Sequence, residues 1–475
     1  IEPLRKYIFA VDPFDSRSRD KNLKGVSDSL QHLKDGGLLA IFPAGEVATW
    51  QDGFKGIRDK DWDPAVIKFI RRAGVPVLPM YIQGRNSTLF RLAGKLHPAL
   101  RTALLPHELF NKRGTCVRVV AGSLIQGRRV DELPGDQYAN YMRASVDYLD
   151  GSRGDKKEVA GADVAASMDG IIERPLLEKL HGEMASVREE YLLFELGGQS
   201  LYCAPPDAIP NMIREIGRCR EITFREIGEG TQKEVDLDGY DEYYHQLFLW
   251  DNEGEALVGG YRMGFGDEIM ERYGINGFYT DSLFRFTDEM APVLRQTIEL
   301  GRSFVSKEYQ KKPGSLMLLW KGIVYVLLKH RQFRNMMGPV TISGEFRDSS
   351  KMIIAAYLGE HHYNRKLARF VRPVLGMKGI KSSIDLSLIK GIGSIDLIGR
   401  LVHDIEGDDR QVPVLVKKYL GLSSSVLGFN VDPDFSYGLD ALMLLDMKHV
   451  PESSIQMLSK EIVDIDVIAR FKNLH

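Results

Sequence analysis

The chain of 475 residues has little cysteine and almost no net charge, and each shortage excludes a class of protein. Its three cysteines, Cys116, Cys203 and Cys219, show no C-x-x-C spacing, which disfavours a metal site or a disulfide framework and favours a reducing, cytoplasmic compartment. A formal net charge of −2 argues against a general nucleic-acid-binding protein. We therefore expect neither a bound metal nor a nucleic-acid partner.

Long apolar runs are also missing. The longest, residues 315–328, is too short to span a bilayer and carries Lys321 in its middle. It predicts a buried helix, with a helix lying on a membrane surface as the alternative. The chain opens on IEPLRKYIFAVD, which has the character of a fold interior, and no signal peptide is visible. We expect the natural N-terminal residues to be missing from this sequence.

The length predicts two domains, because one core rarely serves so many residues. In residues 1–150, apolar runs typical of strands alternate with helical patterns that end in glycine, at 6–12, 26–37, 38–42, 63–74, 75–82 and 116–125. This alternation predicts an α/β layer fold. The composition then becomes polar and loses its apolar period, so we place a linker at 151–188.

Residues 189–475 predict a second α/β domain. Strands are expected at 190–196, 244–251, 257–264, 338–343 and 441–447, with a helix at 207–226. The segment 371–398 is rich in glycine and lysine, and we interpret it as an inserted helical or surface region.

The strand expected at 38–42 ends in a Pro-x-Gly turn formed by Phe42, Pro43, Ala44 and Gly45, and Glu46 follows. Such a turn leaves backbone N–H groups in the crevice beyond the carboxyl end of the strand, where open α/β folds bind ligands. Glu46 would then line a cleft. The alternative is a tight turn that carries an exposed acid.

The stretches YIFAVDPFDSRSRDKN, FPAGEVATW and GVPVLPMYIQGRNS, within residues 7–87, resemble three ordered sequence blocks of the glycerolipid acyltransferase family. The resemblance covers about residues 5–125. It implies that an acceptor binds near Arg17, Phe42, Pro43, Gly45 and Glu46. Where that family has a phosphate-binding arginine this chain has Val47, so the resemblance implies a zwitterionic or amine-bearing lipid acceptor, not a phosphate monoester.

The catalytic His-x-x-x-x-Asp block of that family has no counterpart in residues 1–6. The spacing does occur at His403 and Asp408, but in the other domain, where we interpret it as chance. The N-terminal domain is therefore expected to bind its acceptor without catalysing a reaction.

The second domain carries an ordered set of charged and aromatic residues: Arg220, Phe224, Asp238, Asp241, His245, Arg262, Glu299 and Arg302. Taken singly, each is an ordinary helix-surface or strand-edge residue, for which a structural ion pair is the favoured interpretation. Together they resemble the pattern of acyl-homoserine-lactone synthases, which have an acetyltransferase (GNAT)-like fold. The strings REITFR, LGRSFV, GPVTIS and GFNVDPDF resemble still more closely the ornithine-lipid N-acyltransferases, also described as hemolysin-like, over about residues 190–450.

Acyl transfer from a thioester to an amino acid needs a deprotonated amine. Glu299 is the candidate general base, with His245 as the alternative, and Arg302 or Arg262 would hold the base or a neighbouring aspartate. Arg220 or Arg262 would bind the acceptor's carboxylate, next to Phe224, Asp238 and Asp241.

Backbone N–H groups of Phe304 and Val305, on a splayed strand, are expected to stabilise the thioester oxyanion. Lys307, Lys311 and Lys312 precede a helix that Ser315 can cap, an arrangement suited to the phosphate of a phosphopantetheine arm. The Arg-x-x-Gly-x-Gly loop of coenzyme A-binding relatives is absent, which favours an acyl carrier protein as donor and no tightly bound cofactor. A solvated basic turn is the alternative.

These resemblances imply a bifunctional aminolipid synthase of bacteria. The second domain would transfer a 3-hydroxyacyl chain to ornithine or glycine. In the intact protein, the first domain would O-acylate the lyso-aminolipid at the cytoplasmic membrane surface. Two alternatives are a lysophospholipid acyltransferase with a regulatory C-terminal domain, and a membrane-active hemolysin.

Overall fold

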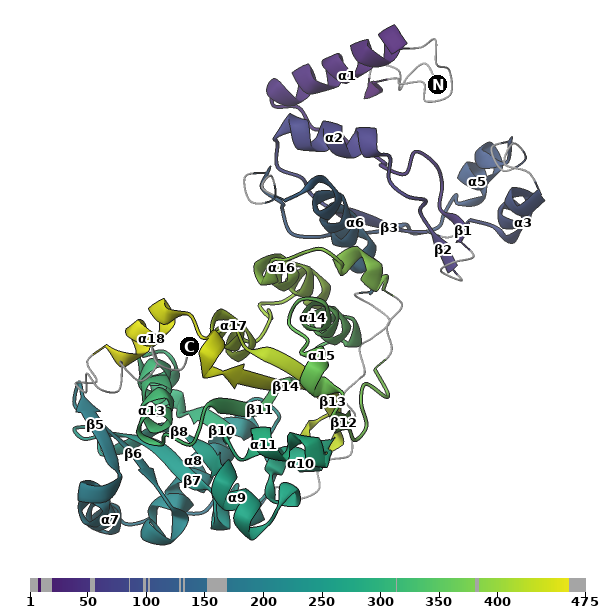
Figure 1. Cartoon of the computed structure of the whole chain (residues 1–475). Helices are drawn as coiled ribbons and strands as arrows, with labels where there is room; N and C mark the ends of the chain where they lie inside the picture. Colours follow the sequence, from purple (N-terminus) through teal and green to yellow (C-terminus); the bar gives the residue numbers. More distant parts are fainter. Residues whose placement is uncertain are drawn as a thin grey trace. The chain divides into compact units, whose positions relative to one another are not determined.

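The structure is a computed structural model, and it describes residues 7–9, 19–51, 56–84, 86–96, 100, 103–127, 130, 133–151, 169–312, 314–380 and 384–460 (Figure 1). The chain divides into two compact units. Unit 1 comprises Ile1–Ser152 with Ile384–Ile392, and unit 2 comprises Arg153–Ser383 with Gly393–His475. None of the described helices is long and apolar enough to cross a membrane.

Unit 1 contains short helices and two small antiparallel sheets, β1–β2 and β3–β4. Its elements are α1 (Arg19–Lys34), β1 (Thr49–Gln51), β2 (Gly56–Arg58), α2 (Pro64–Ala73), β3 (Met80–Gln83), α3 (Thr88–Leu96), α5 (Leu105–Asn111), β4 (Arg118–Ala121) and α6 (Gly135–Gly151). The bounds of α2 follow from its ends. Asp63 caps it by accepting a hydrogen bond from the backbone N–H of Ala65, and Gly74 ends it in the left-handed conformation.

The prediction of a strand at 38–42 was wrong. No strand of the described residues pairs with this run, and Leu38 and Phe42 are 87% and 73% exposed. Without a neighbouring strand, an apolar run has neither ladder hydrogen bonds nor a covered face. The turn after it does form, because the Gly45 N–H donates to the Phe42 carbonyl at 3.0 Å and Gly45 has a φ of 66°.

Part of the region interpreted as an insertion, 371–398, belongs to unit 1. There Asp385 accepts a hydrogen bond from Arg58, and its carbonyl accepts one from the Tyr148 hydroxyl at 2.9 Å. The linker expected at 151–188 also differs in part. Residues 152–168 of it lie outside the described residues, but α7 (Leu177–Tyr191) is a helix whose buried face joins the core of unit 2.

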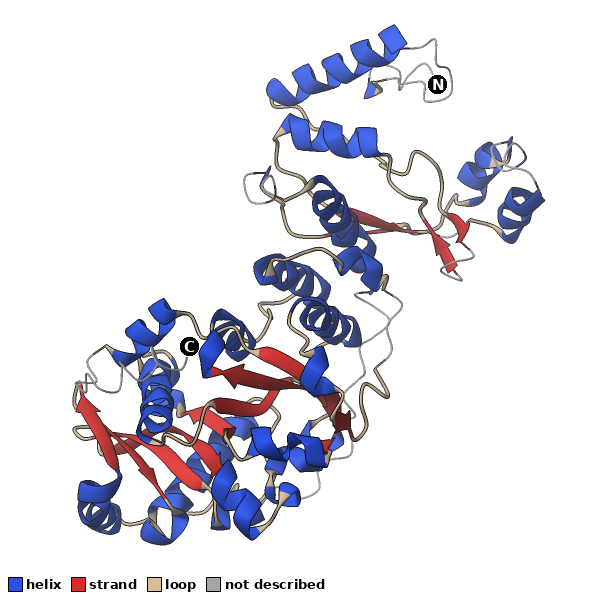
Figure 2. Ribbon diagram, viewed as in Figure 1, coloured by secondary structure: helices blue, strands red, loops and turns tan. Residues whose placement is uncertain are grey.

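Unit 2 is built on one eight-stranded sheet with the order β13-β14-β11-β10-β8-β7-β6-β5 (Figure 2). The strands are β5 (Leu192–Leu196), β6 (Gln199–Ala204), β7 (His245–Asp251), β8 (Ala256–Phe265), β10 (Thr297–Val305), β11 (Asn335–Ile342), β13 (Ser425–Asp432) and β14 (Gly438–Asp446). All neighbouring strands are antiparallel except β10 and β11, which are parallel. All five strands expected in this domain are present.

The two faces of the sheet carry different helices. On one face lie α7, α8 (Met212–Glu226) and the short helices α9 (Gly266–Arg272), α10 (Tyr279–Leu283) and α11 (Ala291–Leu294). On the other lies α13 (Ser315–Lys329), where a Cβ on Gly322 would collide with Leu201 and approach Leu247. This helix is largely buried, as predicted for residues 315–328. The remaining helices of unit 2 are α12 (Lys307–Gln310), α14 (Asp348–His361), α15 (Arg365–Ala368), α16 (Ile395–Glu406), α17 (Val414–Gly421) and α18 (Glu452–Ser459).

Strands β10 and β11 separate partway along their length. Their pairing covers three residues of each strand and ends at Glu299 and Met337. Beyond this point β10 stays paired with β8 as far as Val305, and β11 stays paired with β14 as far as Ile342. The sheet therefore splays open between the C-terminal halves of two parallel strands, where backbone groups of β10 have no ladder partner on the β11 side.

Candidate active site

The sheet register brings charged side chains of several elements onto one face, next to the splay. Arg262 on β8 pairs with Gly301 on β10, and Glu299 lies two positions before Gly301. Residues two apart on a strand share a face, as do directly paired residues. Arg262 and Glu299 therefore point to the same side of the sheet, the side that α8 and α10 cover.

Arg220, on α8, is the best-satisfied charge of the site. Its guanidinium donates to Asp241 Oδ1 at 2.9 Å and Oδ2 at 3.0 Å, to Asp236 Oδ2 at 3.2 Å and to the Asp236 carbonyl at 2.6 Å. The side chain is fully buried. Burial opposes ionisation of Asp241, but Arg220 outweighs it and lowers the pKa of this carboxyl to about 2. With its donors committed to two carboxylates, Arg220 is better placed to hold the site together than to bind a substrate.

Arg262 is only partly satisfied. Its Nη1 donates to Asp238 at 2.6 Å and to Asp241 at 3.1 Å, whereas its buried Nη2 has no hydrogen-bond partner among the described residues. The guanidinium carbon lies 5.3–5.5 Å from the ring centres of three tyrosines, Tyr240, Tyr244 and Tyr279. A buried donor without a partner is costly, so Nη2 marks a place where a ligand oxygen would be bound.

A bulge directs Arg302 into the site. On a regular strand Arg302 would point away from Glu299, because three positions separate them. The register shifts between Gly301 and Phe304, and Arg302 adopts a φ of 48°, which is rare for a non-glycine residue. As a result Arg302 Nη2 lies 3.5 Å from Asp238 Oδ2, and its guanidinium stacks 4.9 Å from the ring centre of Phe435.

Glu299 is completely buried, and protein groups donate to both of its oxygens. Oε2 accepts from the Tyr244 hydroxyl and from the Tyr279 N–H at 3.0 Å, and Oε1 accepts from the Thr280 N–H at 2.8 Å. Burial raises the pKa of this carboxyl against those hydrogen bonds. The base role of Glu299 stays a prediction. Its contacts also suit a positioning role, since it anchors the start of α10 and thereby the Tyr279 ring.

His245 lies apart from this group. It pairs with Met263, the neighbour of Arg262, so its side chain points to the opposite face of the sheet. There it stacks on Phe265 at 4.3 Å between ring centres, and its Nδ1 is buried without a hydrogen-bond partner. Burial lowers the pKa of His245 to about 4, helped by the nearby His330. The structure thus separates His245 from the residues it was expected to join.

The neutral state of His245 predicts a pH dependence of stability. Because its folded pKa lies below that of an ordinary histidine, the unfolded chain binds a proton that the folded chain does not between about pH 6.5 and 4. We expect the free energy of unfolding to fall by roughly 3 kcal/mol as the pH drops through this window. Urea titrations at several pH values measure it. His245→Phe should flatten the profile, and His449→Phe, at a 71% exposed position, should not.

The backbone donors predicted on β10 face different ways. The Ser306 N–H donates to the Val258 carbonyl on β8, so the Val305 N–H points away from β8, into the splay. The Phe304 N–H points toward β8, and its side chain is part of the core. Phe224 packs partly buried against the same core.

The three predicted lysines lie on the surface around α12. Lys307 pairs with Glu226, the Lys312 ammonium lies 4.2 Å from the Tyr309 ring centre, and Lys311 is exposed. The expected cap by Ser315 is wrong. Gly314, with a φ of 106°, occupies the cap position, and no side chain caps this helix. Glycine reaches that conformation without the steric cost that serine would have.

In unit 1, Glu46 forms an ion pair with Lys60, so its charge is compensated within the protein. Asp63 donates its N–H to the Pro43 carbonyl at 3.0 Å, which ties the turn to the start of α2. Arg17 lies outside the described residues. The acceptor site expected around this turn stays a prediction.

Sequence reasoning missed several residues of the site in unit 2: Asp236, Tyr240, Tyr244, Tyr279 and Phe435. The string DGYDEYY, which supplies two of these tyrosines between Asp238 and His245, was the available signal. Aromatic rings packed around a buried guanidinium are a recurrent device for holding it.

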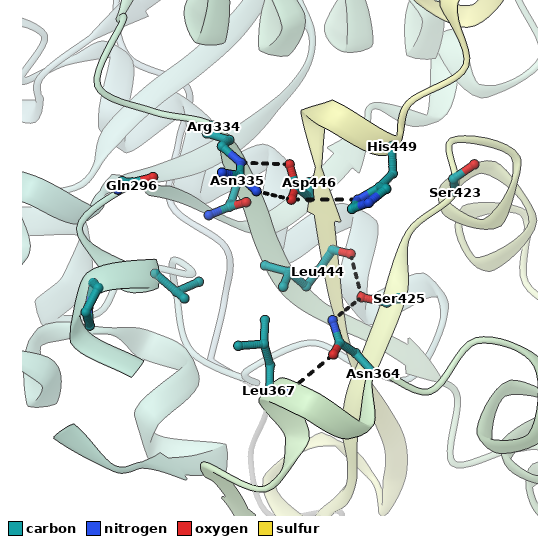
Figure 3. A pocket seen from close by; sticks show the side chains of 12 residues that line it. Gln296, Arg334, Asn335, Asn364, Leu367, Ser423, Ser425, Leu444, Asp446 and His449 are labelled. Atoms are coloured by element: carbon teal, nitrogen blue, oxygen red, sulfur yellow. Dashed lines mark hydrogen bonds and ion pairs between the residues drawn. The ribbon is translucent and has the colours of Figure 1, made fainter. Parts of the chain in front are cut away.

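A separate cavity of about 530 Å³ opens on the same face, near the start of β11 and the end of β14 (Figure 3). Arg334 and His449 approach Asp446 from two sides, with Arg334 bonded to both carboxylate oxygens at 2.9 and 2.5 Å. The charges of Arg334 and Asp446 satisfy one another. The cavity lies by Asn335, at the end of the β10–β11 pairing away from the splay.

One family model and two solved structures match parts of this chain. The model of the acetyltransferase (GNAT) domain family matches residues 219–321, which run from α8 through β10 into α13. Two solved structures are similar at low identity. The CoA-dependent acyl-homoserine lactone synthase MesI shows 12% identity and a TM-score of 0.28 over 55% of this chain and 94% of that one. The AHL synthase LasI shows 14% identity and a TM-score of 0.24 over 35% of this chain and 83% of that one.

Two relatives are 30% identical to this chain. A glycine N(alpha)-acyltransferase of Phocaeicola vulgatus matches over 244 residues, 48% of this chain and 73% of that protein. A glycine N(alpha)-acyltransferase of Bacteroides thetaiotaomicron matches over 283 residues, which are 57% of this chain and 83% of that protein. The protein is thus an acyltransferase with a GNAT domain in unit 2. It belongs to the same family as these two N(alpha)-acyltransferases.

Proposed function

We propose that unit 2 transfers an acyl chain from a thioester to the α-amine of an amino acid, with glycine as the first candidate acceptor and ornithine as the second. The observation that carries this proposal is the unpartnered Nη2 of buried Arg262 beside the splay. An acceptor carboxylate would complete its hydrogen bonds. The acceptor named for both relatives supports glycine.

The reaction forms one C–N bond and breaks one C–S bond. The amine nitrogen attacks the thioester carbonyl carbon, the tetrahedral intermediate places negative charge on oxygen, and its collapse releases the thiol. The Val305 N–H, which points into the splay, is the donor best placed for that oxygen.

The proposed donor is a 3-hydroxyacyl chain on the phosphopantetheine arm of an acyl carrier protein. Acyl carrier proteins are acidic, and exposed Lys307, Lys311 and Lys312 follow the splayed strand directly. Unit 1 is proposed to bind the N-acylated lyso-aminolipid at the cytoplasmic membrane surface and, in the intact protein, to esterify its hydroxyl. The 73% exposed Phe42 on its turn supports contact with an apolar chain.

The test is amide formation by the purified chain. The chain is incubated with a 3-hydroxyacyl carrier protein, or the matching coenzyme A thioester, and with glycine, ornithine, serine or lysine, and products are identified by mass spectrometry. We expect N-acylglycine or N-acylornithine. Glu299→Gln should reduce the rate by about 100-fold, whether Glu299 is the base or positions the site. Glu289→Gln, at an exposed position, is the matched control.

Absence of every amide product from folded chain would contradict the proposal. If the same chain esterified lysophosphatidic acid instead, a lysophospholipid acyltransferase regulated by unit 2 would replace it.

A further inference from the structure

We propose that Asp440, on β14, is the general base that accepts the proton of the acceptor's ammonium group. This inference rests on the proposed N-acyl transfer and deepens it.

The register places Asp440 across the splay from Arg302. Asp440 pairs with Thr341 on β11, four positions beyond the last pair that β11 makes with β10. Met337 pairs with Glu299 on β10 and with Leu444 on β14, so these three side chains share one face of the sheet. Asp440 lies four positions before Leu444 on the same strand and therefore shares that face. The Asp440 side chain therefore points to the face that carries Glu299 and Arg262, from the opposite wall of the opening.

The hairpin that carries Asp440 contacts a residue of the candidate site described above, Arg302. Phe435, in the connection between β13 and β14, stacks on the Arg302 guanidinium at 4.9 Å. Two consecutive residues of this connection, Ser436 and Tyr437, have positive φ values of 50° and 58°. Lys351 holds the strained turn by donating to the Tyr437 and Gly344 carbonyls at 3.2 Å. The wall that bears Asp440 is thus fixed against Arg302.

The bonding of Asp440 differs from that of Asp236, Asp238 and Asp241, which arginines pair with, and from that of Glu299, whose two oxygens both accept hydrogen bonds. It is 3% exposed, one oxygen accepts from the Thr341 hydroxyl at 2.6 Å, and no lysine or arginine of the described residues forms an ion pair with it. Burial raises the pKa of Asp440 to about 7, against the Thr341 hydrogen bond and with further upward contributions from Asp432 and Glu229. A carboxyl group that titrates near neutral pH is suited to proton abstraction, whereas Asp241 is held ionised by Arg220.

The charges on the two walls match an amino-acid zwitterion. On the β8–β10 side, Arg262 offers its unpartnered nitrogen and Arg302 a second guanidinium. On the β13–β14 side lie Asp440 and Asp432. Tyr279 lies between the two sides, because both carboxyls and both arginines influence the pKa of its hydroxyl. A carboxylate bound by the arginines would direct the ammonium group of the same molecule toward Asp440.

The proton balance is complete without a further reactant. Asp440 takes one proton from the ammonium, and the freed lone pair attacks the thioester carbonyl carbon. After the C–N bond forms, the nitrogen loses a second proton and the C–S bond breaks. One of the two protons goes to the departing thiolate and one to solvent.

Asp440→Asn in the full chain is the test variant, because asparagine keeps the shape and can still accept from Thr341. With glycine at pH 7, we expect kcat to fall by about 100-fold or more. The remaining rate should rise about tenfold per pH unit from 7 to 9, as free amine becomes available. With hydroxylamine, whose nitrogen is uncharged near pH 7.5, the hydroxamate should form at nearly the wild-type rate, since no ammonium proton has to be removed.

The controls separate this role from a structural one. Glu299→Gln, if it positions the site, should slow both acceptors equally at every pH, and Asp409→Asn, at an exposed position, should change neither. An Asp440→Asn rate with glycine within threefold of wild type, or an equal loss with both acceptors, overturns the assignment while N-acyl transfer stands. A wild-type chain that acylates neither acceptor overturns the proposed function, and the base assignment with it.

Discussion

Arg220→Met is expected to lower the free energy of unfolding of unit 2 by about 3–5 kcal/mol, because it leaves buried carboxylates without their cation. Asp236 and Asp241 are 1% and 3% exposed, and Arg220 supplies hydrogen bonds to both. Urea unfolding of the full chain, followed by circular dichroism, measures the loss. Arg188→Met, which breaks an exposed pair with Glu195, should leave the transition unchanged.

The same network predicts that the free energy of unfolding falls at low pH. Since the folded pKa of Asp241 is held near 2, below that of an unfolded aspartate, its contribution is complete above about pH 4 and is lost as the pH falls toward 2. Arg220→Met should flatten this pH dependence. Adding Asp236→Asn and Asp241→Asn to Arg220→Met should recover part of the loss at pH 7. If the triple variant is no more stable than the single one, uncompensated charge is not the cause.

The sequence predicts the secondary structure of unit 2 well because its strands are buried and long enough to show their pattern. The strand of residues 244–251 and the helix of 315–328 both occur, within a residue or two of the predicted bounds. In unit 1 the run 38–42 has the same apolar character but no strand beside it. Local composition indicates only which segments can form strands. A strand forms where a neighbouring strand supplies hydrogen bonds and side-chain contacts.

The site was predicted as a set of residues but not as a geometry. Arg220, Asp238, Asp241, Arg262 and Arg302 lie together in one network of ion pairs, and their roles stay predictions. Arg302 meets them only through a bulge, and a two-residue period cannot reveal one. The strand register shows that His245 pairs with Met263, the neighbour of Arg262, so its side chain lies on the opposite face of the sheet.

Asp440 could not be found from the sequence because its environment is long-range. The Thr341 hydroxyl that binds it lies 99 positions earlier in the chain. An aspartate within GLDALMLLD has the pattern of a strand end, and only the order of β11, β14 and β13 reveals that it is buried beside the splay. Pairing between distant strands therefore determines which charges come together beside the splay.

Arg262→Lys is expected to raise KM for the amino-acid acceptor by about 30-fold, with a smaller change in kcat. The variant keeps a positive charge near Asp238 and Asp241 but loses the second guanidinium nitrogen, the one without a partner in the protein. A charge-assisted hydrogen bond contributes about 2 kcal/mol, which corresponds to this factor. Steady-state kinetics at saturating donor measures it, with Arg272→Lys, at an exposed position of α9, as the control.

Methylamine, which lacks the carboxylate, shows whether the lost interaction is with that group. If Arg262 binds the carboxylate, wild type should prefer glycine over methylamine and Arg262→Lys should lose about 30-fold of that preference, because methylamine never made the contact. An equal loss for both amines would instead mean that Arg262 shapes the site through Asp238 and Asp241. A rise in KM for the thioester alone would place Nη2 on the donor side of the splay, and the carboxylate would then have to be bound by Arg302.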